Sequence, residues 1–160
     1  MNTTEKQVRY LFSRYDFCLS SVPVLREEID ALEEELKTLE AQDDRSLKGS
    51  SSDGMPRGSG TSDPTASNAF GGRDANNLKK IIVEKRTILG GYLGSISTVK
   101  LWLNAMTPWQ RAAVEAHLIR GLVITETIQF VKAKTKKKYS ESGVKKLIRT
   151  ALDEIVRENS

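Results

Sequence analysis

The chain has 160 residues, of which 38% are hydrophobic, 29% are charged and 6% are aromatic, with a net charge of +4. This low apolar content predicts long helices with small local cores instead of one large core. The single cysteine, Cys18, excludes an intramolecular disulfide and a cysteine-based zinc site, and the single histidine, His117, argues against a catalytic triad. No apolar run approaches the roughly 20 residues that span a bilayer, and no signal peptide is evident, so we expect a cytoplasmic protein.

Charge is divided unevenly along the chain. Residues 1–44 carry 5 basic and 11 acidic side chains, and residues 107–160 carry 11 basic and 6 acidic side chains. Residues 131–149 hold eight basic side chains against one acid, Glu141, a net charge of +7. An acidic front and a basic back predict two separate tasks in one chain.

The first segment, residues 1–42, is predicted to be a long helix with an apolar heptad seam. Pro23 interrupts the pattern, so we expect a kink or break near residues 20–22, with Ser21 as the cap of a second helix. The seam could pair with the basic helix around residues 78–103 of the same chain, which we favour, or with a second copy of the chain. Its members alternate at spacings of three and four: Val8, Leu11, Tyr15, Cys18, Val22, Leu25, Ile29, Leu32, Leu36 and Leu39.

Residues 43–75 contain 6 Gly, 7 Ser and 2 Pro among 33 positions, which predicts a flexible loop. Helical periodicity returns over residues 76–104. The predicted apolar stripe there consists of Leu78, Ile81, Ile88, Tyr92, Val99 and Trp102, widened by Ile82, Leu89, Ile96 and Leu103.

Residues 105–160 are predicted to form three helices of a helix-turn-helix domain. The first begins with Thr107 as N-cap and Pro108 in the first turn, and ends at Gly121. A short helix follows over about residues 125–133. The last covers about residues 140–157, with Ser140 as N-cap and Val144, Leu147 and Ile148 on its buried face.

A basic, capped last helix after two short helices is the pattern of a DNA-binding module. In that interpretation Glu141, Ser142 and Gly143 in the first turn meet base edges, and Gly143 permits close approach of the backbone. Tyr139 either fills the core or contacts a phosphate. The predicted DNA-binding residues are Lys136, Lys137, Lys138, Tyr139, Ser140, Glu141, Ser142, Gly143, Lys145, Lys146 and Arg149.

The C-terminal part resembles region four of bacterial sigma factors and the sigma-like regulators related to it. The matching recognition-helix segment is YSESGVKKLIRTALDEI, in which the resemblance implies that residues 140–144 form the DNA-proximal turn and that Lys145 contacts the backbone. The interval from Leu122 to Ser140 is longer than the family's. The remaining matching pieces are Met106-Thr107-Pro108, Arg111, Val114, His117-Leu118-Ile119 and Gly121-Leu122.

A second resemblance lies in SSDGMPRGSGTSDPTASNAF, residues 51–70. It is similar to the loop of phage and prophage regulators of the ArpU and RinA type, in which a helical N-terminal part precedes a sigma-like C-terminal part. The resemblance implies an activator of late phage genes that works in a bacterial host, near the nucleoid, with bacterial RNA polymerase as a partner.

We therefore expect an all-α transcription regulator that binds double-stranded DNA and needs no cofactor or membrane. A homodimer through the heptad helix stays open. The alternative is an adaptor that binds RNA polymerase and has only non-specific affinity for DNA. We do not expect an enzyme, since no carboxylates and histidine converge. His117 and Cys18 are expected to be structural, and Trp102 and Trp109 to be packing anchors.

Overall fold

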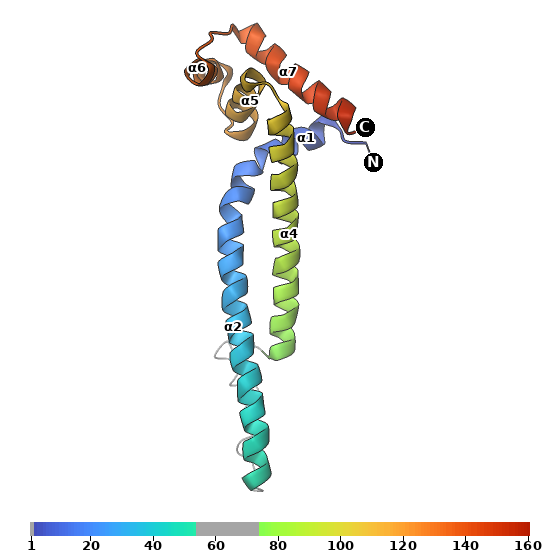
Figure 1. Cartoon of the computed structure of the whole chain (residues 1–160), viewed down its shortest axis with the longest axis vertical. Helices are drawn as coiled ribbons and strands as arrows, with labels where there is room; N and C mark the ends of the chain where they lie inside the picture. The colour runs from blue at the N-terminus through green and yellow to red at the C-terminus, as the bar shows by residue number, and fades with distance from the viewer. Residues whose placement is uncertain (1, 54–73) are drawn as a thin grey trace. The chain divides into compact units, whose positions relative to one another are not determined.

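A computed structural model of the chain describes residues 2–53 and 74–160, with side chains for 2–42 and 74–160. Within these ranges the chain is helical and has no strand, which confirms the all-α prediction. Two compact units are present: unit 1 comprises Met1–Val22 and Gly91–Ser160, and unit 2 comprises Pro23–Gly90. The elements are α1 (Glu5–Ser13), α2 (Tyr15–Asp53), α4 (Ala75–Ala105), α5 (Pro108–Val114), the π-helical turn η1 (Glu115–Ile119), α6 (Ile124–Thr135) and α7 (Glu141–Glu158) (Figure 1).

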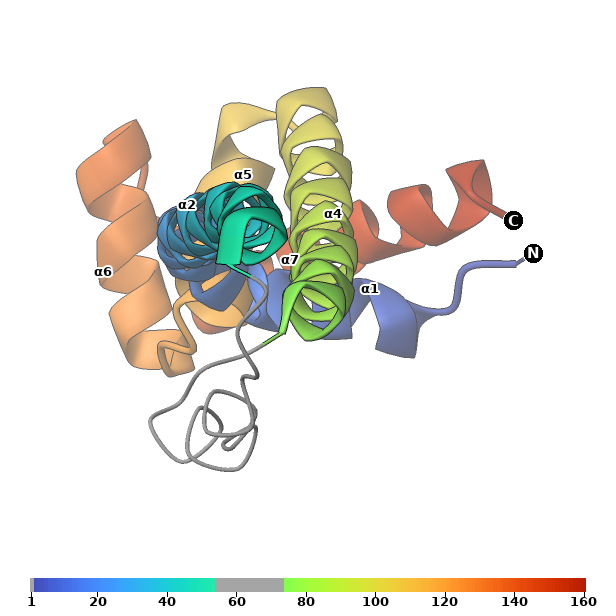
Figure 2. The same ribbon diagram turned by 90° about the horizontal axis from the view of Figure 1, so that it is seen from below.

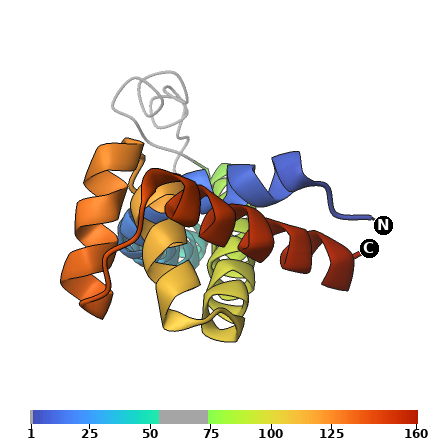
Figure 3. The ribbon, with the colours of Figure 1, turned by 90° about the horizontal axis from the view of Figure 1, so that it is seen from above.

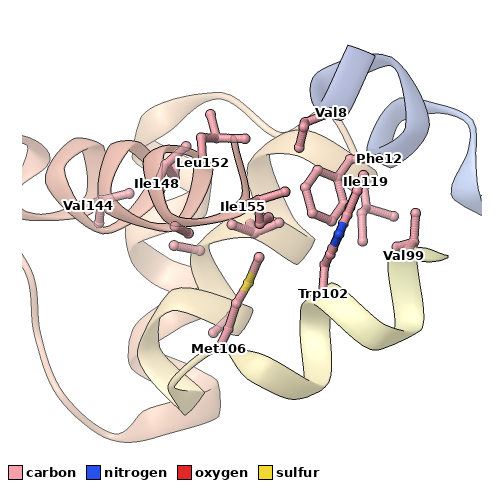
Figure 4. Packing of buried hydrophobic residues seen from close by; sticks show 14 of the residues in the cluster. Val8, Phe12, Val99, Trp102, Met106, Ile119, Val144, Ile148, Leu152 and Ile155 are labelled. Atoms are coloured by element: carbon pink, nitrogen blue, oxygen red, sulfur yellow. The ribbon is translucent and has the colours of Figure 1, made fainter. Parts of the chain in front are cut away.

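Unit 1 has a hydrophobic core to which α1, α4, α5, η1, α6 and α7 contribute buried residues. Phe12 of α1 and Trp102 of α4 pack with ring centroids 5.6 Å apart, and the first is completely buried. From α7, Leu152 and Ile155 enter the same cluster, and Met106 closes it at the end of α4 (Figure 4). The core therefore joins residues from both ends of the chain.

Helix α1 packs against α7, and the two ends of the chain meet. Seen from above, α7 crosses α5 while α1 lies alongside α7 (Figure 3). The amide of Thr3 donates to the carbonyl of Asn159 at 3.4 Å. Val8 of α1 is fully buried in this packing. Sequence periodicity assigned α1 to the acidic segment 1–42, apart from residues 105–160, whereas the structure places it in the unit that contains α7.

Unit 2 is built from the adjoining parts of α2 and α4 (Figure 2). Its small core contains Ile29 and Leu32 from α2 and Leu78 and Ile82 from α4. Three ion pairs join the two helices, and the first and last of them show that the helices run antiparallel, since Glu28 pairs with Lys85 and the later Glu40 with the earlier Lys79. The pairs are Glu28–Lys85, Glu33–Arg86 and Glu40–Lys79.

Of the predicted kink or break near residues 20–22, the break and the cap at Ser21 are wrong, because α2 continues through Pro23 and Ser21 lies inside it. Pro23 is exposed, so the carbonyl of Leu19 that loses its amide partner can be solvated on that side of the helix. The interruption lies instead at Arg14, between α1 and α2. Its guanidinium lies 5.5 Å from the ring centroid of Phe17 and 5.7 Å from that of Tyr92.

The apolar seam of α2 is buried or half-buried as predicted, but the stripe on α4 differs at one position. Ile88 is 46% exposed, whereas Ile82 and Ile96, which were predicted to widen the stripe, are buried. The inward positions follow a seven-residue repeat, in which Lys85 occupies one place and forms an ion pair with Glu28 at 2.8 Å. The predicted stripe included Ile88 and left out Lys85, because a charged residue was not expected at an inward position.

The predicted loop over 43–75 is shorter in the structure, since α2 extends to Asp53 and α4 begins at Ala75. Residues 41–48, AQDDRSLK, contain no glycine or proline, and several of them are good helix formers. The prediction took residues 43–75 as one segment, and the glycine and serine content of its later part hid the helical character of its first residues. Residues 54–73, with most of the second resemblance, lie outside the described residues. No helix within 2–53 or 74–160 combines the length and apolar character needed to cross a membrane.

Candidate nucleic-acid interface

Local hydrogen bonds satisfy backbone groups at the ends of the helices that support the candidate surface. Thr107 and Gln110 form a capping box at the start of α5, as the predicted cap requires. Arg111 donates from Nε to the carbonyl of Leu103 at 2.9 Å, and so satisfies the end of α4. Gly121 has a φ of +70°, and the amide of Leu122 donates to the carbonyl of Ala116 at 2.9 Å. The left-handed Gly121 therefore ends the π-helical turn η1 and turns the chain toward α6.

Helix α6 is longer than predicted and ends in a left-handed residue that is not glycine. The helix runs to Thr135 instead of residue 133, so the long interval from Leu122 to Ser140 is taken up mainly by helix. Lys136 follows with φ 60° and ψ 15°, and its amide donates to the carbonyl of Lys132. A lysine in this conformation is strained relative to glycine. The turn between α6 and α7 is therefore short.

Helix α7 begins where the sequence predicts. Ser140 is the N-cap, and its hydroxyl accepts a hydrogen bond from the amide of Gly143 at 3.1 Å. Val144 and Ile148 are buried and Leu147 is half-buried, so one face of α7 is fixed in the core. The opposite face is consequently held outward.

The predicted DNA-binding residues lie in this turn and in the first half of α7. Tyr139 and Gly143 are half-buried. The others are all exposed: Lys136, Lys137, Lys138, Ser140, Glu141, Ser142, Lys145, Lys146 and Arg149. Because the exposed cations all lie within residues 136–149, their positive potentials add in this part of the molecule.

Two residues of the first turn are engaged inside the chain. Glu141 pairs with Lys145 at 3.0 Å, one helical turn away. Ser142 lies 3.2 Å from the hydroxyl oxygen of Ser140. Both members of the Glu141–Lys145 pair are more than half exposed, so the pair is weak and can exchange for another partner at small cost.

Tyr139 packs its ring against the core and against Gly143. A Cβ atom at position 143 would come within 3.3 Å of both Cδ1 of Tyr139 and Oγ of Ser140. The small residue was predicted to permit close approach of DNA. In the structure the neighbouring tyrosine and the capping serine lie against it, so a larger residue here would require these side chains to move.

A pocket of about 340 Å³ lies beside the surface, between α1 and α7. Lys145 and Arg149 of α7 line it, together with Arg9 of α1. Arg9 forms an ion pair with Glu5 at 2.8 Å, and Asp153 also lines the pocket. Sequence reasoning missed Arg9, because its position in an acidic segment gave no signal that α1 would pack beside α7.

The side chain of His117 is held by a backbone carbonyl, as expected for a structural histidine. Its Nδ1 lies 2.8 Å from the carbonyl oxygen of Leu122, and since a carbonyl only accepts, Nδ1 carries the proton. Cys18 is 1% exposed and lies in the apolar interior. Across the described ranges, no three side chains of histidine, cysteine, aspartate or glutamate lie together as a metal site would require.

No protein-family model matches the chain, and neither a curated protein nor a solved structure is significantly similar to it. The geometry of its own residues is therefore what bears on function.

Proposed function

We propose that the protein is a sequence-specific DNA-binding regulator of transcription, an activator of late phage genes with sigma-like promoter recognition. In this proposal α6 and α7 are the two helices of a helix-turn-helix, and the first turn of α7 enters the major groove. Lys136, Lys137 and Lys138 contact phosphates beside the groove. The observation that carries the proposal is the group of exposed lysines and Arg149 around the capped start of α7.

The buried face of α7 supports this assignment, because its packing fixes the orientation of the exposed face. Val144 and Leu152 are buried in the same core, so the helix cannot rotate without breaking that packing. A helix that contacts base edges must be held in this way, since readout depends on the position of a few side chains.

The antiparallel packing of α2 on α4 supports a second task for the N-terminal part. In the proposal these segments form a helical hairpin whose acidic outer side contacts RNA polymerase or another protein. Glu27, Glu34 and Glu35 are exposed on α2. The seam that could have formed a homodimer is occupied by α4 through Ile29 and Leu32, which favours pairing inside the chain.

The test is selection of binding sites from a random duplex library at about physiological salt, where phosphate contacts alone give weak binding. Wild type is compared with the double variant Glu141→Ala/Ser142→Ala. The proposal predicts an enriched motif whose enrichment falls in the double variant, while affinity for unrelated duplex stays close to wild type. Ser140 keeps the cap in both proteins.

Retention of DNA without any motif would contradict the proposal and favour a polymerase-binding adaptor. In that case the basic surface holds phosphate only, and purified polymerase should bind the protein more tightly than DNA does. A two-fold symmetric motif would show in addition that two copies bind together.

A further inference from the structure

One large aromatic side chain at the edge of the basic surface is not buried. Trp109, in the first turn of α5, is 39% exposed, whereas Trp102 is 7% exposed in the core. Both tryptophans were expected to be packing anchors, and only Trp102 is one. A tryptophan side chain is usually well buried in a monomer, and exposed ones are enriched in binding surfaces.

Trp109 is joined to the surface through Lys137. The ammonium of Lys137 lies 5.6 Å from the ring centroid of Trp109 and 5.1 Å from that of Tyr139. The ring of Tyr139 in turn packs on Gly143, in the first turn of α7. These contacts form a continuous series from α5, through the turn, to the end of α7 that is proposed to enter the groove.

Two rings around one ammonium restrict a side chain that is otherwise very flexible. A free lysine loses much of its rotamer entropy when it is ordered on a ligand. Because contacts with Trp109 and Tyr139 already restrict the side chain of Lys137, part of this entropy is lost before a ligand binds. The ammonium has three N–H donors, and two ring faces leave at least one of them for a phosphate oxygen.

We propose that Trp109 belongs to the DNA interface, where it positions Lys137 on one backbone phosphate and covers the adjoining sugar with its exposed ring edge. The inference rests on the proposed function and adds a contact from α5 outside the recognition helix. Duplex DNA is the favoured occupant because Lys136 and Lys138 flank the cluster with positive charge. An acidic protein surface is the alternative outcome of the test.

The first test uses the tryptophans as probes. A short mixed-sequence duplex suffices at low salt, since a backbone contact does not depend on sequence. Binding is followed by anisotropy of the labelled duplex, and accessibility of Trp109 by acrylamide quenching of tryptophan fluorescence. We expect DNA to protect the quenchable emission in wild type and to leave Trp109→Phe unchanged, because Trp102 is buried in both.

The second test separates contact from simple packing. Trp109→Ala should lower DNA affinity about fivefold, the effect of an exposed cation–π contact. It should also make the slope of log affinity against log salt shallower by about 0.9, because Lys137 is no longer fixed on its phosphate. Lys137→Ala should add little in the Trp109→Ala background. Trp109→Phe keeps a ring and should retain most of the affinity, and Lys138→Ala is the control that should still add to Trp109→Ala.

The outcomes are distinguishable. DNA binding without protection of Trp109, or an unchanged salt slope in Trp109→Ala, overturns this inference and leaves the proposed function standing. No DNA binding at low salt overturns both. Protection of Trp109 by purified polymerase and not by duplex would assign the cluster to a protein partner and would also overturn it. Far-UV circular dichroism of each variant establishes that the fold is intact.

Discussion

Lys136 occupies a backbone conformation that favours glycine, and no other non-glycine residue within 2–53 and 74–160 has a positive φ. A left-handed conformation costs a side-chain-bearing residue about 1–2 kcal/mol. A residue kept in such a conformation at a proposed binding surface suggests that its side chain is needed there. Stability and DNA binding should therefore respond in opposite directions when it is replaced.

Lys136→Gly should raise the free energy of unfolding by about 0.5–1 kcal/mol, because glycine adopts this conformation without strain. The same variant should weaken DNA binding, since one phosphate is left without its cation. Urea denaturation measures the first effect and duplex anisotropy the second. Lys138→Gly is the matched control and should give no gain in stability. A destabilised Lys136→Gly protein would contradict the account.

Ser140 has a structural role as cap that can be separated from its role at the surface. Ser140→Ala should lower the free energy of unfolding by about 1 kcal/mol through loss of the bond to the Gly143 amide. Ser140→Asp keeps an acceptor and should keep the stability, yet its charge should weaken DNA binding. Thermal melting and duplex anisotropy check the two effects. Equal DNA affinity of Ser140→Asp and wild type would argue against a duplex near this residue.

At the scale of elements, unit 2 depends on its small apolar core more than on its ion pairs. The three pairs between α2 and α4 are partly exposed, and such pairs contribute at most about 1 kcal/mol each. Leu78→Ala removes a completely buried side chain and should cost about 2–5 kcal/mol. Val83→Ala, at an exposed site on the same helix, should cost little. Proteolysis within α2 and α4 or hydrogen exchange reports the difference. An equal effect of both substitutions would mean that this packing does not form in solution.

Helix type and helix ends were largely predictable, because local signals determine them. Thr107 and Ser140 are caps, and Gly121 has the positive φ that ends a helix, so each could be identified from neighbouring residues alone. The continuity of α2 through Pro23 could not be identified in this way, since it depends on whether the proline faces solvent. A seven-residue repeat also shows that a face is buried, but not which helix covers it.

The candidate surface shows the same limit. Its lysines and capping serine are contiguous in the sequence, so their proximity followed from the helix assignment. Arg9 and Trp109 come from other elements and depend on tertiary packing that no local pattern encodes. Gly143 shows a further limit, because composition could not reveal that Tyr139 lies on it.

At the scale of the whole molecule, the C-terminal helices depend on both ends of the chain. Val8, Phe12, Val99 and Trp102 lie in the same core as α7, and all four precede residue 105. A fragment of residues 105–160 should therefore lack a cooperative thermal transition, although its sequence suggests a separate domain. Phe12→Ala in the full chain should cost about 3–5 kcal/mol and lower the melting temperature. A fragment that folds cooperatively would contradict this account of unit 1.

The salt dependence of DNA binding by charge-matched variants tests the central claim most directly. With about six phosphate contacts, log affinity of the wild type should fall with log salt at a slope near −5. Lys136→Ala/Lys137→Ala/Lys138→Ala should make the slope shallower by about 0.9 for each phosphate that these lysines neutralise in the wild type. Lys6→Ala/Lys80→Ala/Lys100→Ala removes the same charge from exposed positions elsewhere and should leave the slope unchanged. If both triple variants shift the slope equally, net charge alone holds the DNA, and the surface at the start of α7 is not the interface.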